Sequence, residues 1–235
     1  MPIFKFKKFD IEQEGCAQKV GTDSMVLGAF VDHENPTRIL DIGTGNGVLA
    51  LMMAQKFTNA MISGVEIQQK CAEVAQFNFR NSQFKDRLNA VNVDVNDFES
   101  LEKFDLIVSN PPFFENATPS VKPERTMARH QSNLKLDQLL NFALNNLNIN
   151  GAMWLILPEN SSSSLEDEAI VRGLKLSRKI KVFGKPTIHK RDVLVFEKTD
   201  NSLTPTLDTF TIRTSSGGYT DEYKAKTIEF HHSRL

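Results

Sequence analysis

The chain contains 235 residues, of which 40% are hydrophobic and 24% are charged, and its formal net charge is −1. This composition excludes a disordered or fibrous protein and predicts one globular domain over residues 1–235. Because the charges nearly cancel, a nucleic-acid-binding surface would have to come from local clustering of basic residues.

Short apolar segments and scattered cysteines and histidines exclude further classes. The longest apolar stretch, residues 48–54, is far shorter than the roughly 20 residues of a membrane span. The N-terminus lacks the apolar centre of a signal peptide, so we expect a cytoplasmic protein. Cys16 and Cys71 lack the spacing of a zinc site or a disulfide scaffold, and we interpret both as reduced. The histidines form no metal-ligand pattern, so no metal is inferred. We also infer no protein partner.

Predicted helices and strands alternate along most of the chain. Residues 1–37 form an N-terminal extension with a short helix over 24–30, for which Thr22 or Asp23 would be the N-cap. From residue 38 to residue 198 the order is typical of an α/β domain with a mostly parallel sheet. Strands are predicted at 38–42, 61–66, 88–93, 104–109, 153–157, 175–182 and 193–198, and helices at 48–56, 68–81, 137–147 and 165–173.

Two segments depart from this alternation. Residues 113–133 lack periodicity and contain Pro119 and Pro123, and connections of that length are usually functional or disordered. We expect residues 113–129 of this loop to be mobile without the substrate and to become ordered when the substrate enters. Residues 199–235 predict a strand near 210–213 and a helix from Asp221, which extend or cover the edge of the sheet.

A glycine-rich turn joins the first predicted strand of the alternating region to the following helix. Its sequence is Asp41-Ile42-Gly43-Thr44-Gly45-Asn46-Gly47. Glycines tolerate positive φ and let the backbone approach a ligand, and a helix N-terminus favours negative groups. The spacing differs from the dinucleotide pattern GxGxxG, because the third glycine comes one residue early and an aspartate precedes the first. This difference favours S-adenosylmethionine, whose ammonium group suits Asp41.

Acidic residues also follow the next two predicted strands. Glu66 is placed to accept hydrogen bonds from both hydroxyls of a ribose, and Asp94 to bind an adenine amine. Ile67 and Val95, which follow these acids, belong to the same predicted cofactor site. For each acid taken singly, an N-cap or a solvated turn residue is the alternative.

In this order, the motifs resemble those of class I S-adenosylmethionine-dependent methyltransferases over about residues 38–198. The resemblance implies a Rossmann-like, seven-stranded, mostly parallel sheet with helices on both faces and an antiparallel last strand.

The stretch Ser109-Asn110-Pro111-Pro112-Phe113-Phe114 follows the fourth strand of the alternating region. Methyl transfer to an exocyclic amine requires the nitrogen to be held in line with the sulfonium carbon while acceptors bind its hydrogens. The Asn110 amide oxygen and the Pro111 carbonyl could be those acceptors, and prolines stiffen such a turn. Phe113 could stack on the target base, a contact worth about 1–3 kcal/mol. The alternative is an Asn-Pro turn followed by a phenylalanine that fills the core.

Several motifs together resemble the bacterial tRNA (adenine-N(6))-methyltransferase family that modifies valine tRNA beside the anticodon. They are Lys19-Val20-Gly21-Thr22-Asp23 with Leu27-Gly28-Ala29, Asn110-Pro111-Pro112-Phe113, Ala128-Arg129-His130, and Tyr219-Thr220-Asp221-Glu222-Tyr223. The resemblance covers essentially the whole chain. It implies methyl transfer to adenine 37, with Asn110 at both cofactor and substrate. It also implies that the segment containing Lys19, Thr22 and Asp23 closes over the methionine end of the cofactor.

Basic residues are candidates for contacts with tRNA phosphates. They are Arg129 and His130 on the long loop and Lys190 and Arg191 before the last predicted strand, with Lys5, Lys7 and Lys8 near the N-terminus. A single-stranded loop allows its base to be turned outward into a pocket. The alternative is that these residues form ordinary solvated surfaces.

Other functions remain open at this point. The same chemistry could act on a ribosomal RNA base or a protein glutamine, although 37 leading residues are few for a protein-docking module. A nicotinamide-dependent dehydrogenase is disfavoured by the glycine spacing. A non-catalytic RNA-binding module is disfavoured by the presence of Asp41, Glu66 and Asn110.

Overall fold

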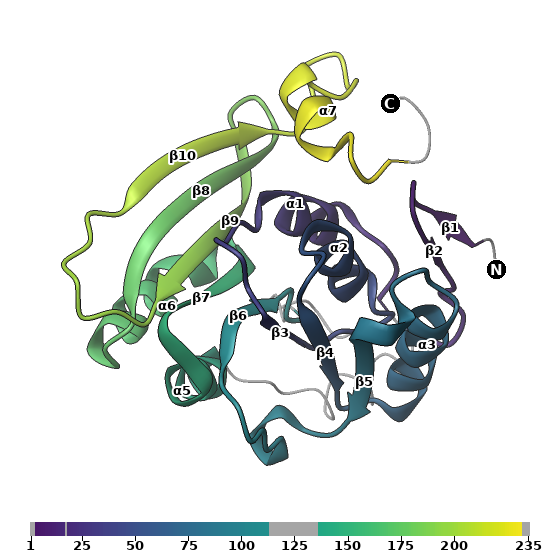
Figure 1. Ribbon diagram of the computed structural model, residues 1–235. Helices are drawn as coiled ribbons and strands as arrows, with labels where there is room; N and C mark the ends of the chain where they lie inside the picture. Colours follow the sequence, from purple (N-terminus) through teal and green to yellow (C-terminus); the bar gives the residue numbers. More distant parts are fainter. Residues whose placement is uncertain (1–2, 17, 113–135, 232–235) are drawn as a thin grey trace, which may run out of the picture.

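A central eight-stranded sheet organises the computed structural model, which describes residues 3–16, 18–112 and 136–231 (Figure 1). The strand order is β10-β8-β9-β7-β6-β3-β4-β5. These strands are β3 (Arg38–Ile42), β4 (Met61–Glu66), β5 (Leu88–Asn92), β6 (Phe104–Ser109), β7 (Leu147–Pro158), β8 (Lys175–Lys185), β9 (Ile188–Glu197) and β10 (Thr206–Thr211). A separate hairpin near the N-terminus is formed by β1 (Phe4–Lys5) and β2 (Asp10–Ile11).

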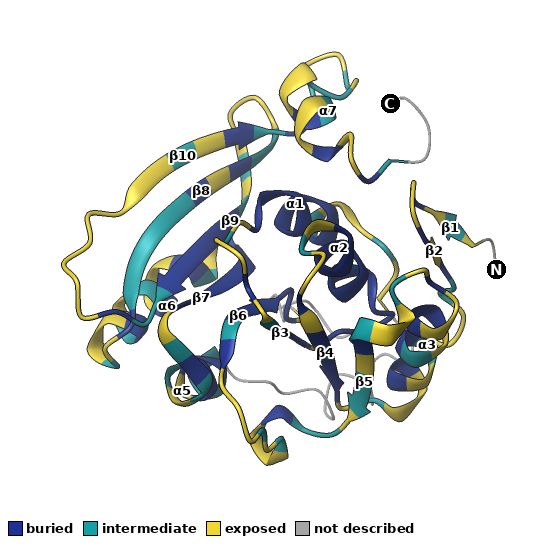
Figure 2. Cartoon of the chain, viewed as in Figure 1, coloured by how far each residue is buried: buried dark blue, intermediate teal, exposed yellow. Residues whose placement is uncertain are grey.

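Helices cover both faces of this sheet. They are α1 (Thr22–Phe30), α2 (Val48–Lys56), α3 (Gln69–Arg80), α5 (Leu136–Asn146), α6 (Glu159–Val171) and α7 (Asp221–Thr227), with short 3-10 helices η1 (Lys85–Arg87) and η2 (Val95–Asp97). Side chains of α1, α2, α3 and α7 pack in one apolar core, and those of α5 and α6 in another. Successive residues of a strand point to opposite faces, so Ile39 belongs to the first core and Leu40 to the second. Figure 2 shows the buried strands between the two layers.

The strand directions agree with the expected class I methyltransferase fold. Strands β5, β4, β3, β6 and β7 run parallel, whereas β9 runs antiparallel to both of its neighbours, β7 and β8. The prediction of a mostly parallel sheet with an antiparallel last strand is therefore confirmed. The predicted number of strands is wrong by one, because β10 pairs in parallel with β8 and adds an eighth strand at that edge.

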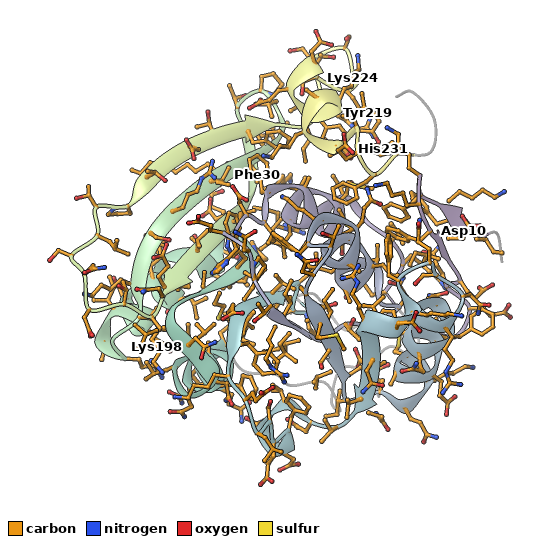
Figure 3. All side chains as sticks on the ribbon, viewed as in Figure 1. Asp10, Phe30, Lys198, Tyr219, Lys224 and His231 are labelled. Atoms are coloured by element: carbon orange, nitrogen blue, oxygen red, sulfur yellow. A yellow bond between two sulfur atoms is a disulfide. The ribbon has the colours of Figure 1, made fainter. Side chains whose placement is uncertain are left out.

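The C-terminal segment both extends and covers the sheet. β10 adds a strand at the edge, and α7 packs against α1, with Lys226 Nζ over the Phe30 ring. The Tyr219 and Tyr223 rings stack with centroids 4.6 Å apart, and the Phe30 ring meets Phe210 edge-on at 4.8 Å. Figure 3 labels Tyr219 and His231 beside α7, where each ring neighbours that of Tyr223.

Two predicted helix starts are wrong. Neither Thr22 nor Asp23 caps α1, because the helix begins at Thr22 and its N-cap is Gly21, which makes no side-chain capping bond. The predicted helix 165–173 begins earlier, at Glu159, and includes a run of four serines that are poor helix formers. Ser162 is buried and donates a hydrogen bond to the Asp192 carboxylate, so contact with the sheet outweighs propensity there.

The last two predicted strands are parts of one longer hairpin. The predicted strand 175–182 extends to Lys185 in β8, and residues 193–197 of the predicted strand 193–198 are the second half of β9. The stretch 188–192 does not have the apolar pattern of a buried strand, yet it pairs with β8, and Arg191 and Asp192 pair with β7 as well. This pairing makes it part of a strand despite its composition.

Gly47 provides a test of how tightly the glycine-rich turn is packed. It adopts a φ of +82°, and an added Cβ would lie 2.5 Å from Cε1 of the buried Phe79 ring. We expect Gly47→Ala to lower the free energy of unfolding by about 2–5 kcal/mol, combining left-handed strain with overpacking. Urea denaturation measures this loss.

Gly173→Ala is the matched control. Gly173 also has a positive φ, +92°, but an added Cβ would meet nothing within 4 Å. This variant should lose only the strain contribution, about 1–2 kcal/mol. Equal losses in the two variants would contradict the proposed clash with Phe79.

Candidate active site

A cavity lies at the carboxyl edge of the sheet, where the parallel neighbours β3 and β6 end. Their register pairs Ile42 with Ser109, so the next residues, Gly43 and Asn110, leave the sheet side by side. The start of α1 and the segment before it complete the walls. The lining residues are Gln18, Lys19, Ser24, Asp41, Gly43, Thr44, Gly45, Asn46, Val48, Leu49 and Asn110. The glycine turn and the Asn-Pro-Pro corner therefore share one cavity.

The glycine turn needs left-handed backbone at three positions. Gly43, Gly45 and Gly47 have φ values of +70°, +57° and +82°, which side-chain-bearing residues rarely adopt. The amides of Gly43 and Thr44 both donate to the Val65 carbonyl, which fixes the turn against β4. An added Cβ at Gly43 would meet nothing within 4 Å, so a ligand has room to approach the backbone there.

Asp41 is the buried acid of the cavity. Its Oδ2 accepts hydrogen bonds from Thr44 Oγ1 at 2.6 Å and from the Ala50 amide at 3.1 Å. Its Oδ1 is buried and has no hydrogen-bond partner within the described part of the chain. Burial raises the pKa of the Asp41 carboxyl to about 7, although the bonds from Thr44 and Ala50 lower it and the nearby Glu66 raises it further. A cationic group would satisfy the unpaired oxygen and favour the charged form.

Glu66 supports the glycine turn and is absent from the lining of the cavity. Its Oε2 accepts from the Gly45 amide at 3.0 Å and its Oε1 from the Gln68 amide at 2.9 Å. Burial raises the pKa of the Glu66 carboxyl above its ordinary value, against the lowering effect of these amides. Each carboxylate oxygen has a further lone pair, so the present bonds leave capacity for ligand hydroxyls.

The residues predicted for the adenine end lie apart from the cavity. The Asp94 carboxylate caps η2 by accepting from the Asn96 amide at 2.9 Å. Val95 is buried in the core shared with α5, and Ile67 is exposed. None of these three residues lines the cavity.

Asn110 presents an unpaired acceptor at the cavity wall. Its Nδ2 donates to Ser24 Oγ at 2.9 Å, and both side chains are buried. Its Oδ1 is buried with no partner among the residues that the structure describes. Pro111 is buried and Pro112 is exposed, whereas the predicted Phe113, Arg129 and His130 lie outside the described residues, as does the loop predicted to be mobile.

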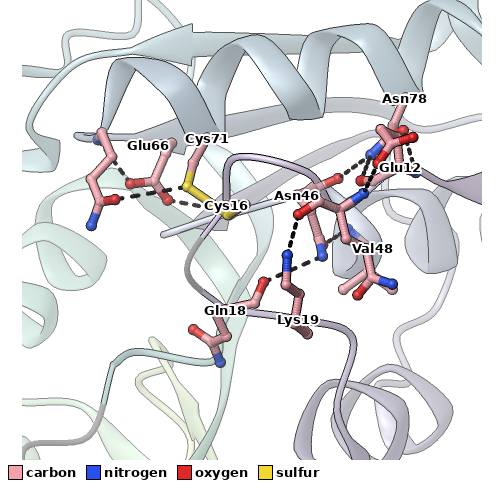
Figure 4. The surroundings of a disulfide bond; sticks show 12 residues. Glu12, Cys16, Gln18, Lys19, Asn46, Val48, Glu66, Cys71 and Asn78 are labelled. Atoms are coloured by element: carbon pink, nitrogen blue, oxygen red, sulfur yellow. Dashed lines mark hydrogen bonds between the residues drawn. A yellow bond between two sulfur atoms is a disulfide. The ribbon is translucent and has the colours of Figure 1, made fainter. Parts of the chain in front are cut away.

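The N-terminal segment reaches the cavity through Lys19. Lys19 Nζ donates to the Gln13 carbonyl, and Asn46 Nδ2 donates to the Gln18 carbonyl at 3.5 Å. Asn78 on α3 donates to the carbonyls of Glu12 and Asn46 and so joins this segment to the glycine turn (Figure 4). Ser24, Thr44, Asn46 and Asn78 were not predicted as site residues; only Thr44 and Asn46 had a sequence signal, their place inside the glycine motif.

The interpretation of both cysteines as reduced and unrelated is wrong. Cys16 and Cys71 form a disulfide that attaches the N-terminal segment to the first turn of α3 (Figure 4). Cys16 Sγ lies 3.9 Å from the position of an added Cβ on Gly45, so the disulfide borders the glycine turn. The two cysteines are 55 positions apart, and their spacing matches no framework motif, which is why sequence alone gave no indication of the pairing.

Of the other predicted site residues, two form an ion pair with each other and two are exposed at the surface. Asp23 Oδ2 accepts from Arg191 Nε at 2.9 Å, so these two predicted site residues bind each other. Thr22 and Lys190 are exposed. Lys8 lies at the opposite edge of the sheet, because its carbonyl accepts from Gln83, just beyond the C-terminal end of α3.

In the described ranges, no group of three or more His, Cys, Asp or Glu side chains is arranged to hold a metal ion. No described helix has both the length and the apolar character needed to span a bilayer.

Comparisons with known proteins agree on a methyltransferase. A family model described as methyltransferase small domain matches residues 16–172. A tRNA1(Val) (adenine(37)-N6)-methyltransferase of Porphyromonas gingivalis is 39% identical over 97% of this chain and 94% of its own length. A protein of Trichodesmium erythraeum with the same description is 38% identical over 97% of each chain. A solved structure described as a predicted O-methyltransferase from Agrobacterium tumefaciens has a TM-score of 0.66 at 17% identity, covering 91% of this chain and 98% of its own, which shows the fold alone.

The raised pKa of Asp41 predicts a specific pH dependence of stability. Between the ordinary aspartate pKa of 3.8 and the folded value of about 7, the folded state holds this proton more tightly than the unfolded state. The contribution of Asp41 to stability is therefore largest below pH 3.8 and is lost as the pH rises towards 7. The free energy of unfolding should fall with pH in this window by at most about 1.4 kcal/mol per pH unit because of Asp41. We expect Asp41→Asn to remove this dependence, as measured by urea denaturation at several pH values.

Asp105→Asn is the control of opposite sign. Burial of Asp105 opposes ionisation, but hydrogen bonds from Thr37 and Asn148 outweigh it and lower the pKa of its carboxyl. Asp105 thus contributes stability above the unfolded pKa that is lost as the pH falls. If both variants changed the pH slope in the same direction, the assignment of the raised pKa to Asp41 would be wrong.

Proposed function

The chain belongs to the tRNA1(Val) (adenine(37)-N6)-methyltransferase family, and from that membership we propose that it methylates N6 of adenine 37 in a valine tRNA, using S-adenosylmethionine. The single observation that carries the proposal is that two buried acceptors on one cavity, Asp41 Oδ1 and Asn110 Oδ1, have no partner among the described residues. Asp41 Oδ1 suits a cation, and Asn110 Oδ1 suits an amine hydrogen. Such a pairing is expected where a cationic cofactor and an amino base meet.

The residues around the glycine turn fit S-adenosylmethionine, which when bound supplies an electrophilic methyl group on a sulfonium. Asp41 would hold the ammonium through its unpaired Oδ1, and the open backbone at Gly43 would lie against the ligand. Glu66 would accept hydrogen bonds from the ribose hydroxyls and Asp94 from the adenine amine, as in the sequence-based expectation. Lys19 and the rest of the extension before residue 38 would close over the methionine end.

Asn110 and Pro111 would act on the target amine. Their side-chain and main-chain oxygens would accept its two hydrogens, which draws the nitrogen lone pair out of the ring and directs it at the methyl group. Pro111 and Pro112 restrict the corner so that these acceptors stay aimed. No strong base is needed, because the methylated nitrogen is acidic and loses its proton to solvent. Phe113 would stack on the base.

The tRNA would be held by basic residues near the cavity. Lys190 is exposed on β9, which begins at the carboxyl edge because it runs antiparallel to β7. Arg129 and His130, on the long loop, remain proposed phosphate contacts. A tRNA substrate also implies a cytoplasmic location. Disulfides are uncommon in that compartment, so the Cys16–Cys71 disulfide departs from the usual cytoplasmic pattern.

The substrate assignment is tested by following labelled methyl groups from the cofactor. We expect incorporation into a valine tRNA transcript and its loss when adenine 37 is replaced by guanine, because the acceptor pair requires an exocyclic amine at the position of N6. The same enzyme is incubated with ribosomal RNA and with protein extract. Labelling of ribosomal RNA or protein, with none in tRNA, would show that the chemistry is right and the substrate wrong.

The role of Asn110 is tested with Asn110→Ala. We expect turnover to fall by about 10²–10³-fold, the usual effect of removing one positioned hydrogen-bonding group from the reacting atoms, while affinity for S-adenosylhomocysteine stays within threefold. Single-turnover methylation and calorimetry measure the two quantities. Asn146→Ala, which removes a helix-end hydrogen bond to Phe142, should change neither. Unchanged turnover in Asn110→Ala would remove the assigned role.

A further inference from the structure

Arg191 and Asp23 form an ion pair that joins distant parts of the chain beside the cavity. Arg191 Nε lies 2.9 Å from Asp23 Oδ2, between residues 168 positions apart. The Arg191 side chain is 23% exposed and the Asp23 side chain 30%. Asp23 is in the first turn of α1, where a carboxylate also interacts favourably with the helix dipole.

The geometry of β9 makes Arg191 a firm anchor. Its backbone is paired with Pro158 of β7 on one side and with Val182 of β8 on the other. Because side chains alternate along a strand, Arg191 points to the same face as Val193 and Val195, which pack in the core shared with α1. Its guanidinium therefore reaches α1 from a strand held on both edges.

The residue after Asp23 contacts the proposed catalytic amide. Ser24 Oγ accepts from Asn110 Nδ2 at 2.9 Å, and the two side chains are only 6% and 8% exposed. The first turn of α1 is thus attached to β9 through Asp23 and to the end of β6 through Ser24. A shift of this turn would move the hydroxyl that holds the Asn110 amide.

We propose that Arg191 is a positioning residue: by holding Asp23 it fixes the first turn of α1, so that Ser24 keeps Asn110 Oδ1 directed into the cavity. This assignment rests on the proposed function only where it predicts an effect on turnover; the positioning of Asn110 does not depend on it. It replaces the expectation that Arg191 binds a tRNA phosphate. Lys190 is exposed at a β-bulge between β8 and β9, where it has no paired residue in β8, and it remains available for that contact.

Kinetics with tRNA separate a positioning residue from a phosphate contact. We expect Arg191→Gln to lower kcat about tenfold, with KM for tRNA and its salt dependence within twofold of the wild type. A lost phosphate contact would instead raise KM and leave kcat unchanged. It would also reduce the slope of log affinity for tRNA against log salt concentration by about one. That second pattern in Arg191→Gln would overturn the proposal, whereas it is the expected pattern for Lys190→Gln.

Further variants test the pair itself. Arg191→Lys keeps a positive donor and should recover part of the lost turnover. The double variant Arg191→Gln with Asp23→Asn should be no slower than the slower single variant, since both remove one interaction. Additive losses would show that the two side chains act separately and would contradict the proposal.

The matched control is a second ion pair at the other end of α1. Arg178 Nε lies 2.7 Å from Asp208 Oδ2, with side-chain exposures of 35% and 43%, and the Arg178 guanidinium lies over the Phe30 ring. Because this pair has the same atoms in contact and no link to the carboxyl edge, Arg178→Gln should leave kcat and KM unchanged. A tenfold loss of kcat in Arg178→Gln would show that loosening either end of α1 lowers turnover, and would contradict a specific role of Arg191.

An experiment without catalysis distinguishes this inference from the proposed function. In 15N-labelled free enzyme, the side-chain amide resonances of Asn110, assigned by their loss in Asn110→Ala, should shift in Arg191→Gln and stay unchanged in Arg178→Gln. Resonances unmoved by Arg191→Gln would overturn the inference. If they move but the wild type methylates no tRNA, the proposed function fails while the positioning by Arg191 holds.

Discussion

The buried carboxylate of Asp41 is the interaction on which the site depends. One of its oxygens binds both the Thr44 hydroxyl and the Ala50 amide, and so connects the end of β3, the glycine turn and the start of α2. Burial raises the pKa of this carboxyl to about 7 and outweighs the lowering effect of the hydrogen bonds from Thr44 and Ala50. A cation in the cavity would complete this arrangement. The carboxylate that shapes the turn through Oδ2 therefore also presents Oδ1, which has no partner among the described residues, to a positive ligand.

The second requirement is the register between β3 and β6. Pairing of Ile42 with Ser109 places the glycine turn and the Asn-Pro-Pro corner next to each other as they leave the sheet. Parallel neighbouring strands end at one edge, so two motifs more than sixty positions apart become parts of one cavity. The remaining wall is formed by the chain before β3: Lys19 lines it, and Ser24 binds the Asn110 amide.

Long-range pairings explain why some expectations were wrong. Arg191 has the local appearance of a surface cation, yet its partner is a carboxylate on the first helix. Cys16 and Cys71 match no spacing motif, but the path of the N-terminal segment over α3 brings them together. Arg191 and Asp192 lie in a mostly polar stretch and still belong to a strand, because their backbone pairs with β7 as well as with β8. In each case the deciding contact is made by residues that no short window of sequence contains.

The sequence by itself determined the α/β class, the bounds of β3, β4 and β6, the glycine turn and the Asn-Pro-Pro corner. Each of these follows from local properties: apolar runs for buried strands, glycines for left-handed backbone and prolines for a restricted turn. Only the tertiary structure decided that β10 adds an eighth strand, that Glu66 supports the turn and is absent from the cavity lining, and that Arg191 pairs with Asp23. The physical reason is that strand partners and ion-pair partners are chosen by proximity in the packed molecule, whereas a linear pattern records only the preferences of each residue for burial and backbone conformation.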